Sequence, residues 1–470
     1  MAFQSAAYGR ALTALLSVLS LGASAWAQGQ VSKPTAPVSP VAVGEPVAEP
    51  SVPMATDDQV LQMGVVRGDT VIPYTSLALP GDPPDQVYTH VLLRRPSAAF
   101  AASAARRFAA SAALGGVFAA PGFTTAAGTG TGPGSSYLPA DLYKAYGLPT
   151  SGGSGVIAII DAYDYPNALS DFNAFSRLAG LPQETSTKAT ATSNKVLQVV
   201  YATGRRPPAD PSPGTNNANL ESALDIEWAH AMAPNAKIVL ILAPSLSYYD
   251  LLYTGVNKAN NFPGVKQVSM SFGSGEFSNQ TFYDRYFQKS GIVYFASTGD
   301  AGGVISYPSC SPYVVGVGGI SLTTTGGTAQ AYSSETAWSG SGGGASTIYG
   351  LPSYQTGITA NGTPLTARSV PDVSFLADPQ TGAYAVLNGG GYIVGGTSLA
   401  CPCIAGIVNA RQSNAASSQA ELTNLYNNYK SANYLNLFHD ITTGTAGSFS
   451  SFSGWDFTTG VGTPKGNGGL

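Results

Sequence analysis

The sequence predicts an α/β fold in which helices cover both faces of a parallel β-sheet. Short apolar runs rich in β-branched residues, such as 156–160 and 292–296, alternate with segments of helical periodicity. Strands that alternate with helices of about 10–15 residues are typical of right-handed βαβ units and therefore of a parallel sheet. Asp161, Ser271 and Asp300 each lie at the end of a predicted strand, where the active sites of such sheets are found.

The predicted elements follow one another from residue 137 onwards. Residues 156–160 form a buried strand, because the run is continuously apolar and β-branched. The next helix begins at Pro166 and ends before Gly180, since proline is favoured in the first helical turn and glycine after the last. Further strands are predicted over 196–201, 238–242, 265–271 and 292–296, and further helices over 219–232, 248–258, 280–289 and 397–411.

Residues 1–27 have the pattern of a secretory signal peptide. Arg10 provides a positive charge, residues 11–21 form an uncharged apolar run, and Ala25-Trp26-Ala27 matches the cleavage pattern of such signals. No later stretch stays apolar over the roughly 18 residues that a membrane span requires. We therefore expect a secreted protein without stable membrane association.

Residues 28–136 are interpreted as a low-complexity, propeptide-like region that ends in a linker. Its first part is rich in proline, valine and alanine, which favours an extended chain. Residues 61–95 are expected to form a few strands, 97–113 an alanine-rich helix, and 124–136 an exposed linker. The main domain is expected to span 137–470.

The composition narrows the range of functions. Only 48 of 470 residues are charged, and the net charge is −4. Without surplus positive charge, nucleic-acid binding is not expected, and a coiled coil would need far more Glu, Lys and Leu. The three cysteines and three histidines show no zinc-binding spacing, and one disulfide from Cys310 to Cys401 or Cys403 remains open.

Ser398 is the candidate nucleophile. It follows the turn Gly395-Gly396-Thr397 at the start of a predicted buried helix, where small residues let a substrate backbone approach and the helix N-terminus favours negative charge. A serine in this place also serves as an ordinary helix cap. With Pro402 the segment reads G-T-S-x-x-x-P, which resembles the nucleophile segment of subtilisin-like serine peptidases and of the related sedolisins, the serine-carboxyl peptidases.

Glu221 and Asp225 are the candidate general base and its partner. On a helix they lie about 40° apart, whereas His230 lies about 180° from Glu221. Trp228 and Met232 continue the face of the two acids, so this face is otherwise apolar, and close carboxyl groups on it would share a proton. The segment 219–234 resembles the E-x-x-x-D helix of sedolisins, including the A-x-A-P sequence that ends it.

The resemblance to sedolisins extends over roughly 137–464 and implies further roles. The turn Ser297-Thr298-Gly299-Asp300 is similar to the sedolisin S-x-G-D-x-G turn, in which the aspartate stabilises the oxyanion. Such an acid does this only when it is protonated. The C-terminal segments resemble the sedolisin calcium loop, and by that resemblance one structural Ca²⁺ is held by the carboxylates of Asp440 and Asp456 and by the carbonyl groups of Ile441 and Gly454.

The resemblance implies a subtilisin-like fold and a secreted, monomeric endopeptidase acting on proteins or peptides. Ser398 is the expected nucleophile, Glu221 the base, Asp225 its partner and Asp300 the oxyanion donor. A carboxylate base stays partly ionised in acid, where histidine is protonated, so we expect activity at acid pH and its loss near neutrality.

Two alternatives remain open at this point. One is a subtilisin-like peptidase that uses Asp161 and His230 with Ser398, which would be most active above about pH 7. The other is a secreted binding protein that has the same fold but no catalytic activity. The joint presence of all four sedolisin-type residues argues against the second alternative.

Overall fold

The structure is a computed structural model that describes residues 52–79, 82–83, 85–95, 136–325, 330–411 and 413–470. All of these belong to one compact unit. The predicted signal peptide (1–27), the alanine-rich helix (97–113) and most of the linker (124–136) lie outside the described residues.

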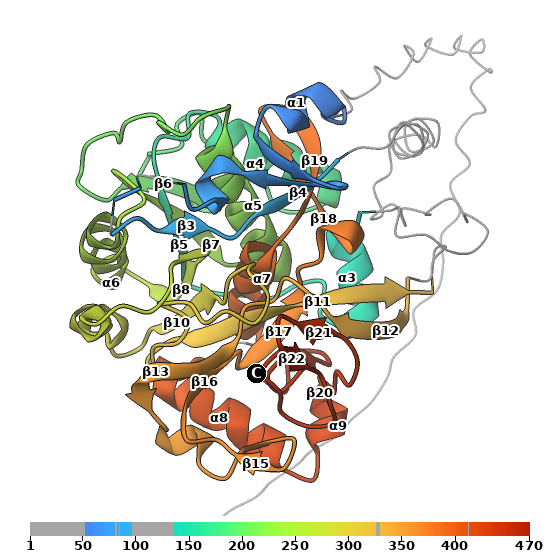
Figure 1. The fold of residues 1–470 in the computed structure, drawn as a ribbon. Helices are drawn as coiled ribbons and strands as arrows, with labels where there is room; N and C mark the ends of the chain where they lie inside the picture. The colour runs from blue at the N-terminus through green and yellow to red at the C-terminus, as the bar shows by residue number, and fades with distance from the viewer. Residues whose placement is uncertain (1–51, 80–81, 84, 96–135, 326–329, 412) are drawn as a thin grey trace, which may run out of the picture. The chain divides into compact units, whose positions relative to one another are not determined.

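An eight-stranded sheet forms the centre of this unit (Figure 1). Six neighbouring strands pair in parallel in the order β6, β7, β5, β8, β10 and β11, while β12 adds to one edge antiparallel and β17 pairs with β11 in parallel. The strands are β5 (Val156–Ala162), β6 (Leu197–Tyr201), β7 (Lys237–Ala243), β8 (Val265–Met270), β10 (Val293–Ser297), β11 (Val315–Thr324), β12 (Tyr332–Ala337) and β17 (Val373–Leu376).

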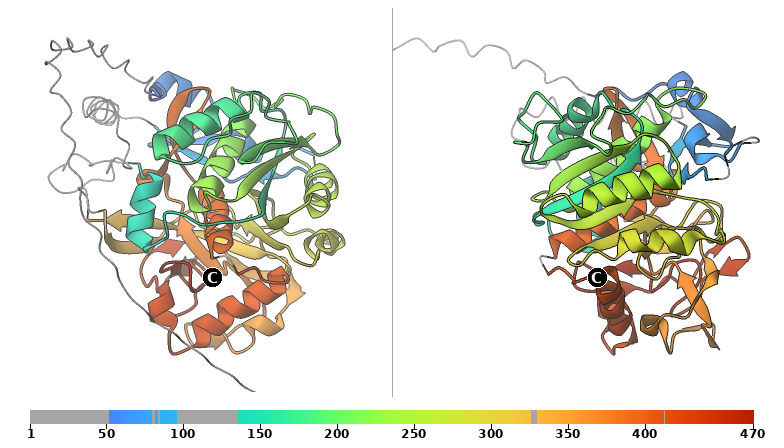
Figure 2. Two further views of the ribbon diagram at one scale, coloured as in Figure 1. Left: turned by 180° about the vertical axis from the view of Figure 1, so that it is seen from behind. Right: turned by 90° about the vertical axis from the view of Figure 1, so that its left-hand side faces the viewer.

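Helices cover both faces of the sheet (Figure 1 and Figure 2). The helices α4 (Ala168–Ala179), α5 (Asn217–Met232) and α7 (Thr397–Ala410) cover one face, and η2 (Tyr249–Val256) with α6 (Asn257–Asn260) covers the other. Alternate residues of β5 divide between these layers: Ile157 and Ile159 pack with the core of α5 and α7, whereas Ala158 and Ile160 pack with that of η2. The apolar run of β5 thus has the pattern of a strand buried on both faces.

The predicted elements are present with small shifts of their ends, and two differ in type. Residues 280–287 form the 3₁₀ helix η3 (Gln280–Phe287) instead of an α-helix, consistent with its aromatic and β-branched residues of low helix propensity. The predicted helix 248–258 is a π-helix over Tyr249–Val256, where the Thr254 hydroxyl donates a hydrogen bond to the carbonyl of Asp250.

A second, five-stranded sheet joins the N-terminal segment to the C-terminal half of the chain. All its strands pair antiparallel in the order β1, β2, β4, β19 and β18, and the blue strands β2 and β4 lie beside the orange β19 and β18 in Figure 1. The few strands expected within 61–95 are therefore confirmed. They are β1 (Gly64–Arg67), β2 (Thr70–Pro73), β3 (Tyr88–Thr89) and β4 (Leu92–Arg94). Strand β3 pairs with β9 (Phe272–Gly273) and β4 with β19 (Gly390–Gly395), which in turn pairs with β18 (Ala383–Leu387).

The remaining elements are short or peripheral. The helices are α1 (Asp57–Leu61), η1 (Tyr74–Ser76), α3 (Pro139–Tyr146), η4 (Ser353–Gln355), η5 (Pro379–Thr381), α8 (Ser418–Lys430) and α9 (Tyr434–Leu437). The strands are β13 (Gly344–Gly350), β14 (Thr359–Ala360), β15 (Thr363–Pro364), β16 (Ala367–Val370), β20 (Phe438–His439), β21 (Thr445–Ala446), β22 (Phe449–Ser450) and β23 (Thr463–Pro464).

The sequence also led to expectations about a disulfide bond and about membrane-spanning segments. Cys310, Cys401 and Cys403 are all buried and free, so the disulfide left open by the sequence is not formed. Among the described residues, no helix combines the length and the apolar character needed to cross a membrane.

Candidate active site

Ser398 lies in the first turn of α7, directly after strand β19. The connecting residue Gly396 has φ 92°, and a Cβ atom there would lie 2.0 Å from the carbonyl oxygen of His90 and 2.6 Å from Oδ2 of Asp300. Only glycine fits this turn, because other residues would be strained and would collide with both groups. The turn presents the fully buried Ser398 to the groups described below.

Pro402 leaves the carbonyl group of Ser398 without its usual partner in the helix. Proline has no N–H, and the fourth residue after Ser398 would otherwise donate to this carbonyl. Ser271, just beyond β8, has its hydroxyl 3.3 Å from the Ser398 carbonyl oxygen and 2.9 Å from Oδ1 of Asp225. The Ser271 hydroxyl has one proton and can donate only one hydrogen bond. Its contacts with Asp225 and with the Ser398 carbonyl are both hydrogen bonds when a protonated Asp225 donates to Ser271 and Ser271 donates to the Ser398 carbonyl.

Glu221 and Asp225 project from α5 into the interior. Every residue of this helix except Asn219 is buried. The two acids therefore do not lie on a solvent-exposed face, where charged pairs are common. Neither carboxyl oxygen of Glu221 has a hydrogen-bond partner among the described residues. Burial, followed by the negative charges of Asp225 and Asp161, raises the pKa of Glu221 well above its usual value, and the nearby Ser398 hydroxyl lowers it in part.

Asp225 and Asp161 complete a buried cluster of carboxyl groups with Glu221. Burial raises the pKa of Asp225 well above its usual range, and the charge of Asp161 raises it further. Burial also raises the pKa of Asp161 to about 7. Close carboxyl groups cannot all ionise cheaply, so the cluster holds protons at a pH where isolated acids would be charged.

Asp300 lies beyond strand β10 and faces the start of α7. Its Oδ1 accepts hydrogen bonds from the backbone N–H of Thr397, at 2.8 Å, and from the Thr397 hydroxyl, at 2.9 Å. Its Oδ2 is buried without a partner among the described residues. Burial raises the pKa of Asp300 to about 7 although the bonds from Thr397 lower it, so below that pH Oδ2 carries a proton that it can donate.

His230 does not take part in this cluster. Its Nε2 lies 2.8 Å from the carbonyl oxygen of Pro182, and its ring packs on Phe172 at 4.8 Å between centroids. This is the side of α5 that faces α4, as the helical spacing from Glu221 predicts. The arrangement of Asp161, His230 and Ser398 that a subtilisin-like triad needs is therefore not present.

His90 forms a part of the site that the sequence did not predict. The backbone N–H of His90 lies 3.1 Å from Ser398 Oγ, and its carbonyl oxygen accepts a hydrogen bond from the Ser398 N–H, also at 3.1 Å. The residues around His90 in the sequence do not indicate that it lies beside Ser398. The partly alternating residues 86–94 indicate a strand but not the strand with which it pairs.

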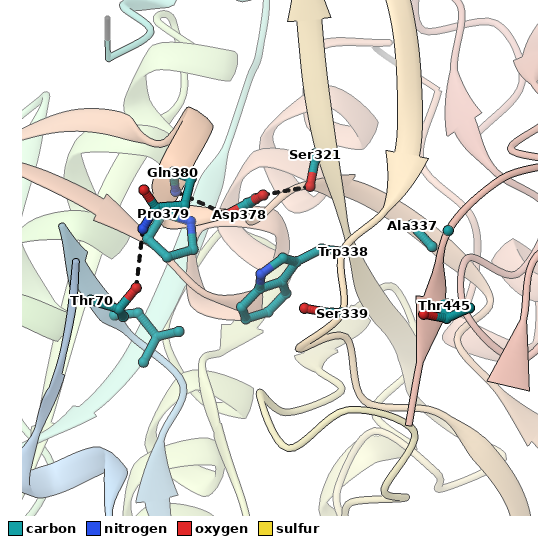
Figure 3. Close-up of a pocket in the computed structure, with 11 residues that line it drawn as sticks. Thr70, Ser321, Ala337, Trp338, Ser339, Asp378, Pro379, Gln380 and Thr445 are labelled. Atoms are coloured by element: carbon teal, nitrogen blue, oxygen red, sulfur yellow. Dashed lines mark hydrogen bonds between the residues drawn. The ribbon is translucent and has the colours of Figure 1, made fainter. Parts of the chain in front are cut away.

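A cavity of about 460 Å³ adjoins the same segment (Figure 3). Leu92 lines it together with Thr70 and Trp338, while Ser321 and Gln380 bond to Asp378 at its edge. Ser398, Glu221, Asp225 and Asp300 are not among its lining residues. The cavity therefore extends from the segment that covers the candidate active site and is not the active site itself.

The candidate calcium ligands gather at one loop near the C-terminus. The Asp440 carboxylate accepts from the N–H of Gly454 at 3.0 Å, and Asp456 Oδ2 accepts from the N–H of Phe452 at 3.2 Å. Within the described residues, the carbonyl groups of Ile441 and Gly454 accept no hydrogen bond. Two carboxylates and two free carbonyl groups form an all-oxygen set, which fits Ca²⁺. Among the residues that the structure describes, no cluster of three or more His, Cys, Asp or Glu could hold a metal ion, so any Ca²⁺ here would need carbonyl ligands as well.

Comparisons with known proteins agree with this fold. Residues 212–461 match the profile of the Subtilase family. The chain is 31% identical to kumamolisin from Bacillus sp. (strain MN-32) over 71% of its own length, and 29% identical to sedolisin from Pseudomonas sp. (strain 101) over 72%. The matches cover 62% and 61% of those two proteins.

The fold is also similar to a solved structure. Pseudomonas sedolisin, a serine-carboxyl proteinase complexed with two molecules of pseudo-iodotyrostatin, superimposes with a TM-score of 0.59 at 27% identity. The match covers 72% of this chain and 96% of that chain. The predicted α/β class, with a parallel sheet between helices, is therefore confirmed.

Proposed function

Because this chain belongs to the subtilase family, we propose that it is a serine endopeptidase of sedolisin type that hydrolyses proteins or peptides in acid. The observation that carries the proposal is the buried, unpartnered carboxyl group of Glu221 beside the Ser398 hydroxyl. A buried carboxyl without a hydrogen bond is costly, and a nucleophile next to a carboxyl base is the arrangement that acyl transfer requires.

The first half of the reaction forms an acyl-enzyme. Ser398 Oγ attacks the carbonyl carbon of the substrate, and its proton passes to Glu221. The oxyanion that forms accepts hydrogen bonds from the Ser398 N–H and from protonated Asp300. The C–N bond then breaks, and Glu221 returns the proton to the departing amine, so that an ester between Ser398 and the acyl part remains.

The second half of the reaction releases the acid and restores the enzyme. Water attacks the ester carbon, Glu221 takes a proton from this water, and the same oxyanion donors act again. The proton then returns to Ser398 Oγ as the carboxylic acid leaves. Asp225 acts as a positioning residue, because its contact with Ser271 connects helix α5 to the Ser398 carbonyl.

The proposal includes a processed, exported and calcium-stabilised protein. Residues 1–27 act as the signal, 28–136 as the propeptide-like region with its linker, and 137–470 as the peptidase domain, which works as a monomer. Asp440 and Asp456, with the carbonyl groups of Ile441 and Gly454, would hold one Ca²⁺. When bound, this ion supplies positive charge that fixes the loop and takes no part in the chemistry.

The test compares Glu221→Gln and Ser398→Ala with the unaltered protein on a denatured protein substrate at pH 4 and pH 8. Each variant is expected to lose at least about 10³-fold in kcat, because the nucleophile and its base act as a unit. Circular dichroism checks that the variants are folded. A Glu221→Gln variant with full activity at pH 4 would contradict the proposed mechanism.

A further inference from the structure

The cavity of about 460 Å³ lies against the turn that leads to Ser398 (Figure 3). Asp378, which lines it, directly follows Ala377, and the Ala377 carbonyl accepts a hydrogen bond from the N–H of Gly396 at 2.6 Å. A Cβ atom added to Gly395 would lie 2.5 Å from the same carbonyl oxygen. One wall of the cavity therefore packs directly on the residues that precede the candidate nucleophile.

A second wall of the cavity follows the loop of Asp300. Trp338 and Ser339 line this wall, and the carbonyl of the next residue, Gly340, accepts a hydrogen bond from the N–H of Gly302 at 2.9 Å. Gly302 lies two residues after Asp300 in the sequence. The cavity is thus built from loops that contact both of the groups to which the proposed mechanism assigns the oxyanion.

Strand β4 shows how a peptide chain reaches the cavity. The carbonyl of His90 accepts from the Ser398 N–H at 3.1 Å, and the chain then pairs antiparallel with β19 through Leu92 and Leu93. Because side chains alternate along a strand, Leu92 lines the cavity, whereas Leu93 packs in the main core. A substrate in the same register would place the second residue of its leaving fragment in the cavity.

Asp378 gives the cavity a negative charge. Among the described residues that line the cavity, it has the only charged side chain. Its Oδ1 accepts a hydrogen bond from the N–H of Gln380 at 2.8 Å, and its Oδ2 accepts one from the hydroxyl of Ser321 at 2.6 Å. Both donors are uncharged, so they orient the carboxylate without neutralising it. The cavity therefore favours a positively charged group.

The indole of Trp338 provides a rigid apolar surface in the cavity. A Cβ atom added to Gly340 would lie 2.3 Å from Cζ2 of this ring, and one added to Gly319 would lie 2.8 Å from its Cε3. The ring is thus fixed by close packing on two glycines, and Figure 3 shows it directed into the cavity. A tryptophan ring attracts a cation and packs against an aliphatic stem, which lysine and arginine combine.

A basic side chain already lies at the edge of the cavity. Arg94 follows Leu92 by two residues on the same face of β4, and its Nη1 donates to the carbonyl of Gln380 at 3.0 Å. Burial lowers the pKa of Arg94, and the negative charges of Asp69 and Asp378 offset part of this decrease. The surroundings of Asp378 therefore stabilise a guanidinium group, although Arg94 itself does not line the cavity.

We propose that this cavity is a subsite for a lysine or arginine side chain on the second residue of the leaving fragment, and that Asp378 and Trp338 determine this specificity. The proposal rests on the proposed peptidase function and names the class of its substrates. The aliphatic stem of the substrate side chain packs on the indole, and its charged end binds the Asp378 carboxylate and the hydroxyl groups of Ser321 and Ser339. All four residues belong to the predicted peptidase domain.

Peptides that differ at one position test the proposal. They are built around a bond that the full chain cleaves in a denatured protein, with Lys, Leu or Glu as the second residue after that bond. At pH 5 we expect kcat/KM to be about tenfold higher for the Lys peptide than for the Leu peptide, because an ion pair and a cation–π contact both favour lysine. The Glu peptide should be hydrolysed most slowly, and mass spectrometry checks the position of the cut.

A pair of matched variants tests the role of Asp378. Asp378→Asn keeps an oxygen for the Gln380 N–H but removes the charge, and it should bring the ratio of kcat/KM for the Lys and Leu peptides to about one. Asp250 also accepts from a serine hydroxyl, that of Ser245 at 2.6 Å, but it belongs to η2 on the other face of the central sheet. Asp250→Asn should therefore keep the ratio. Circular dichroism checks that both variants fold.

The remaining outcomes separate this proposal from the proposed function. If the unaltered protein hydrolysed the Lys and Leu peptides equally well, or if Asp378→Asn kept the preference for lysine, the subsite would be overturned and the peptidase function would stand. A protein that cleaved neither the denatured substrate nor any peptide would overturn the peptidase function, and the subsite with it.

Discussion

Single residues decide how the candidate active site can work. Gly396 has no side chain, which leaves room for Oδ2 of Asp300 and for a peptide carbonyl beside the Ser398 N–H. Thr397 binds only Oδ1 of Asp300, so the other oxygen remains directed at the site. The protonation of this one oxygen then determines whether the site offers one oxyanion donor or two.

Asp300→Asn is expected to extend activity to higher pH. In the unaltered protein the pKa of Asp300 is about 7, so the O–H donor is lost as the pH rises through that value. An asparagine amide can accept from Thr397 with its oxygen and donate with its N–H at any pH. The kcat of this variant, measured between pH 4 and 9, should not fall near pH 7.

Asp300→Ala provides the control for this prediction. It removes the donor at every pH and should lower kcat about 100- to 1000-fold without changing the shape of the profile. If the asparagine variant lost activity over the same pH range as the unaltered protein, Asp300 would not be the group that limits it.

Two loop connections hold the elements around the site. The buried ion pair of Arg368 and Asp372 joins the end of β16 to β11, since Asp372 Oδ2 also accepts from the N–H of Gly316 at 2.8 Å. Tyr426 of α8 donates to the other oxygen of Asp372 at 2.7 Å. The second connection is the candidate calcium loop, which lies between β20 and β23.

Asp372→Ala should destabilise the protein strongly. Both side chains of the pair are fully buried, so removal of the carboxylate leaves the positive charge of Arg368 buried without a neutralising negative charge. A loss of about 3–5 kcal/mol is expected in urea unfolding of the inactive Ser398→Ala chain. Asp164→Ala removes the partner of the exposed Arg206 and should cost far less. Equal losses for the two variants would contradict this assignment.

Calcium should raise the thermal stability of the Ser398→Ala chain. An ion that binds only the folded state raises the free energy of unfolding, by about 2.7 kcal/mol at a free-ion concentration of 100 times Kd. The thermal midpoint therefore rises with the Ca²⁺ concentration. Differential scanning calorimetry with EDTA and with added Ca²⁺ measures this shift. Asp440→Asn should abolish the response, whereas Asp210→Asn, at a half-buried aspartate outside the candidate calcium loop, should keep it. An unaltered midpoint in excess Ca²⁺ would rule out the site.

The whole molecule combines few charges with many buried acids. Only 22 Lys and Arg are present, so the positive charge gained when carboxylates protonate in acid remains small. Burial raises the pKa values of Asp161, Asp300 and Glu335 to about 7 each, and those of Glu221 and Asp225 rise as well. The fold is thus suited to a pH at which Asp161, Asp300 and Glu335 are protonated.

Stability should fall as the pH rises from about 6 to 8. Between the unfolded pKa near 4 and the raised folded pKa, the folded state binds more protons than the unfolded chain, so its stability decreases with pH. The buried histidines act in the opposite sense, because burial lowers the pKa of His90 to about 3 and of His230 to about 4, but this effect ends above about pH 6.5.

The midpoint of thermal unfolding of the Ser398→Ala chain, measured at constant ionic strength, checks this prediction. Glu335→Gln should make the decline shallower, because Glu335 is a buried acid outside the active site that Tyr146 and Thr463 hydrogen-bond. A midpoint that increased from pH 6 to 8 would show that the buried acids ionise freely in the folded protein.

The sequence by itself determined the fold class and indicated four candidate site residues. Alternation of buried strands and helices is a local signal, so β5, β7 and β8 and helix α5 were predicted to within a residue or two. The spacing of Glu221 and Asp225 follows from helical geometry alone, as does the opposite position of His230. These features depend on residues that are close together in the chain, so local sequence patterns are sufficient to predict them.

Only the tertiary structure decided what covers the site and how its protons are held. The pairing of β3 with β9 and of β4 with β19 joins residues about 180 and 300 positions apart, and no local pattern specifies such partners. The raised pKa of Glu221 results from burial, then from the charge of Asp225 on the same helix and from that of Asp161 on strand β5. Long-range contacts and desolvation are properties of the packed chain, and for that reason the role of His90 could not be read from the sequence.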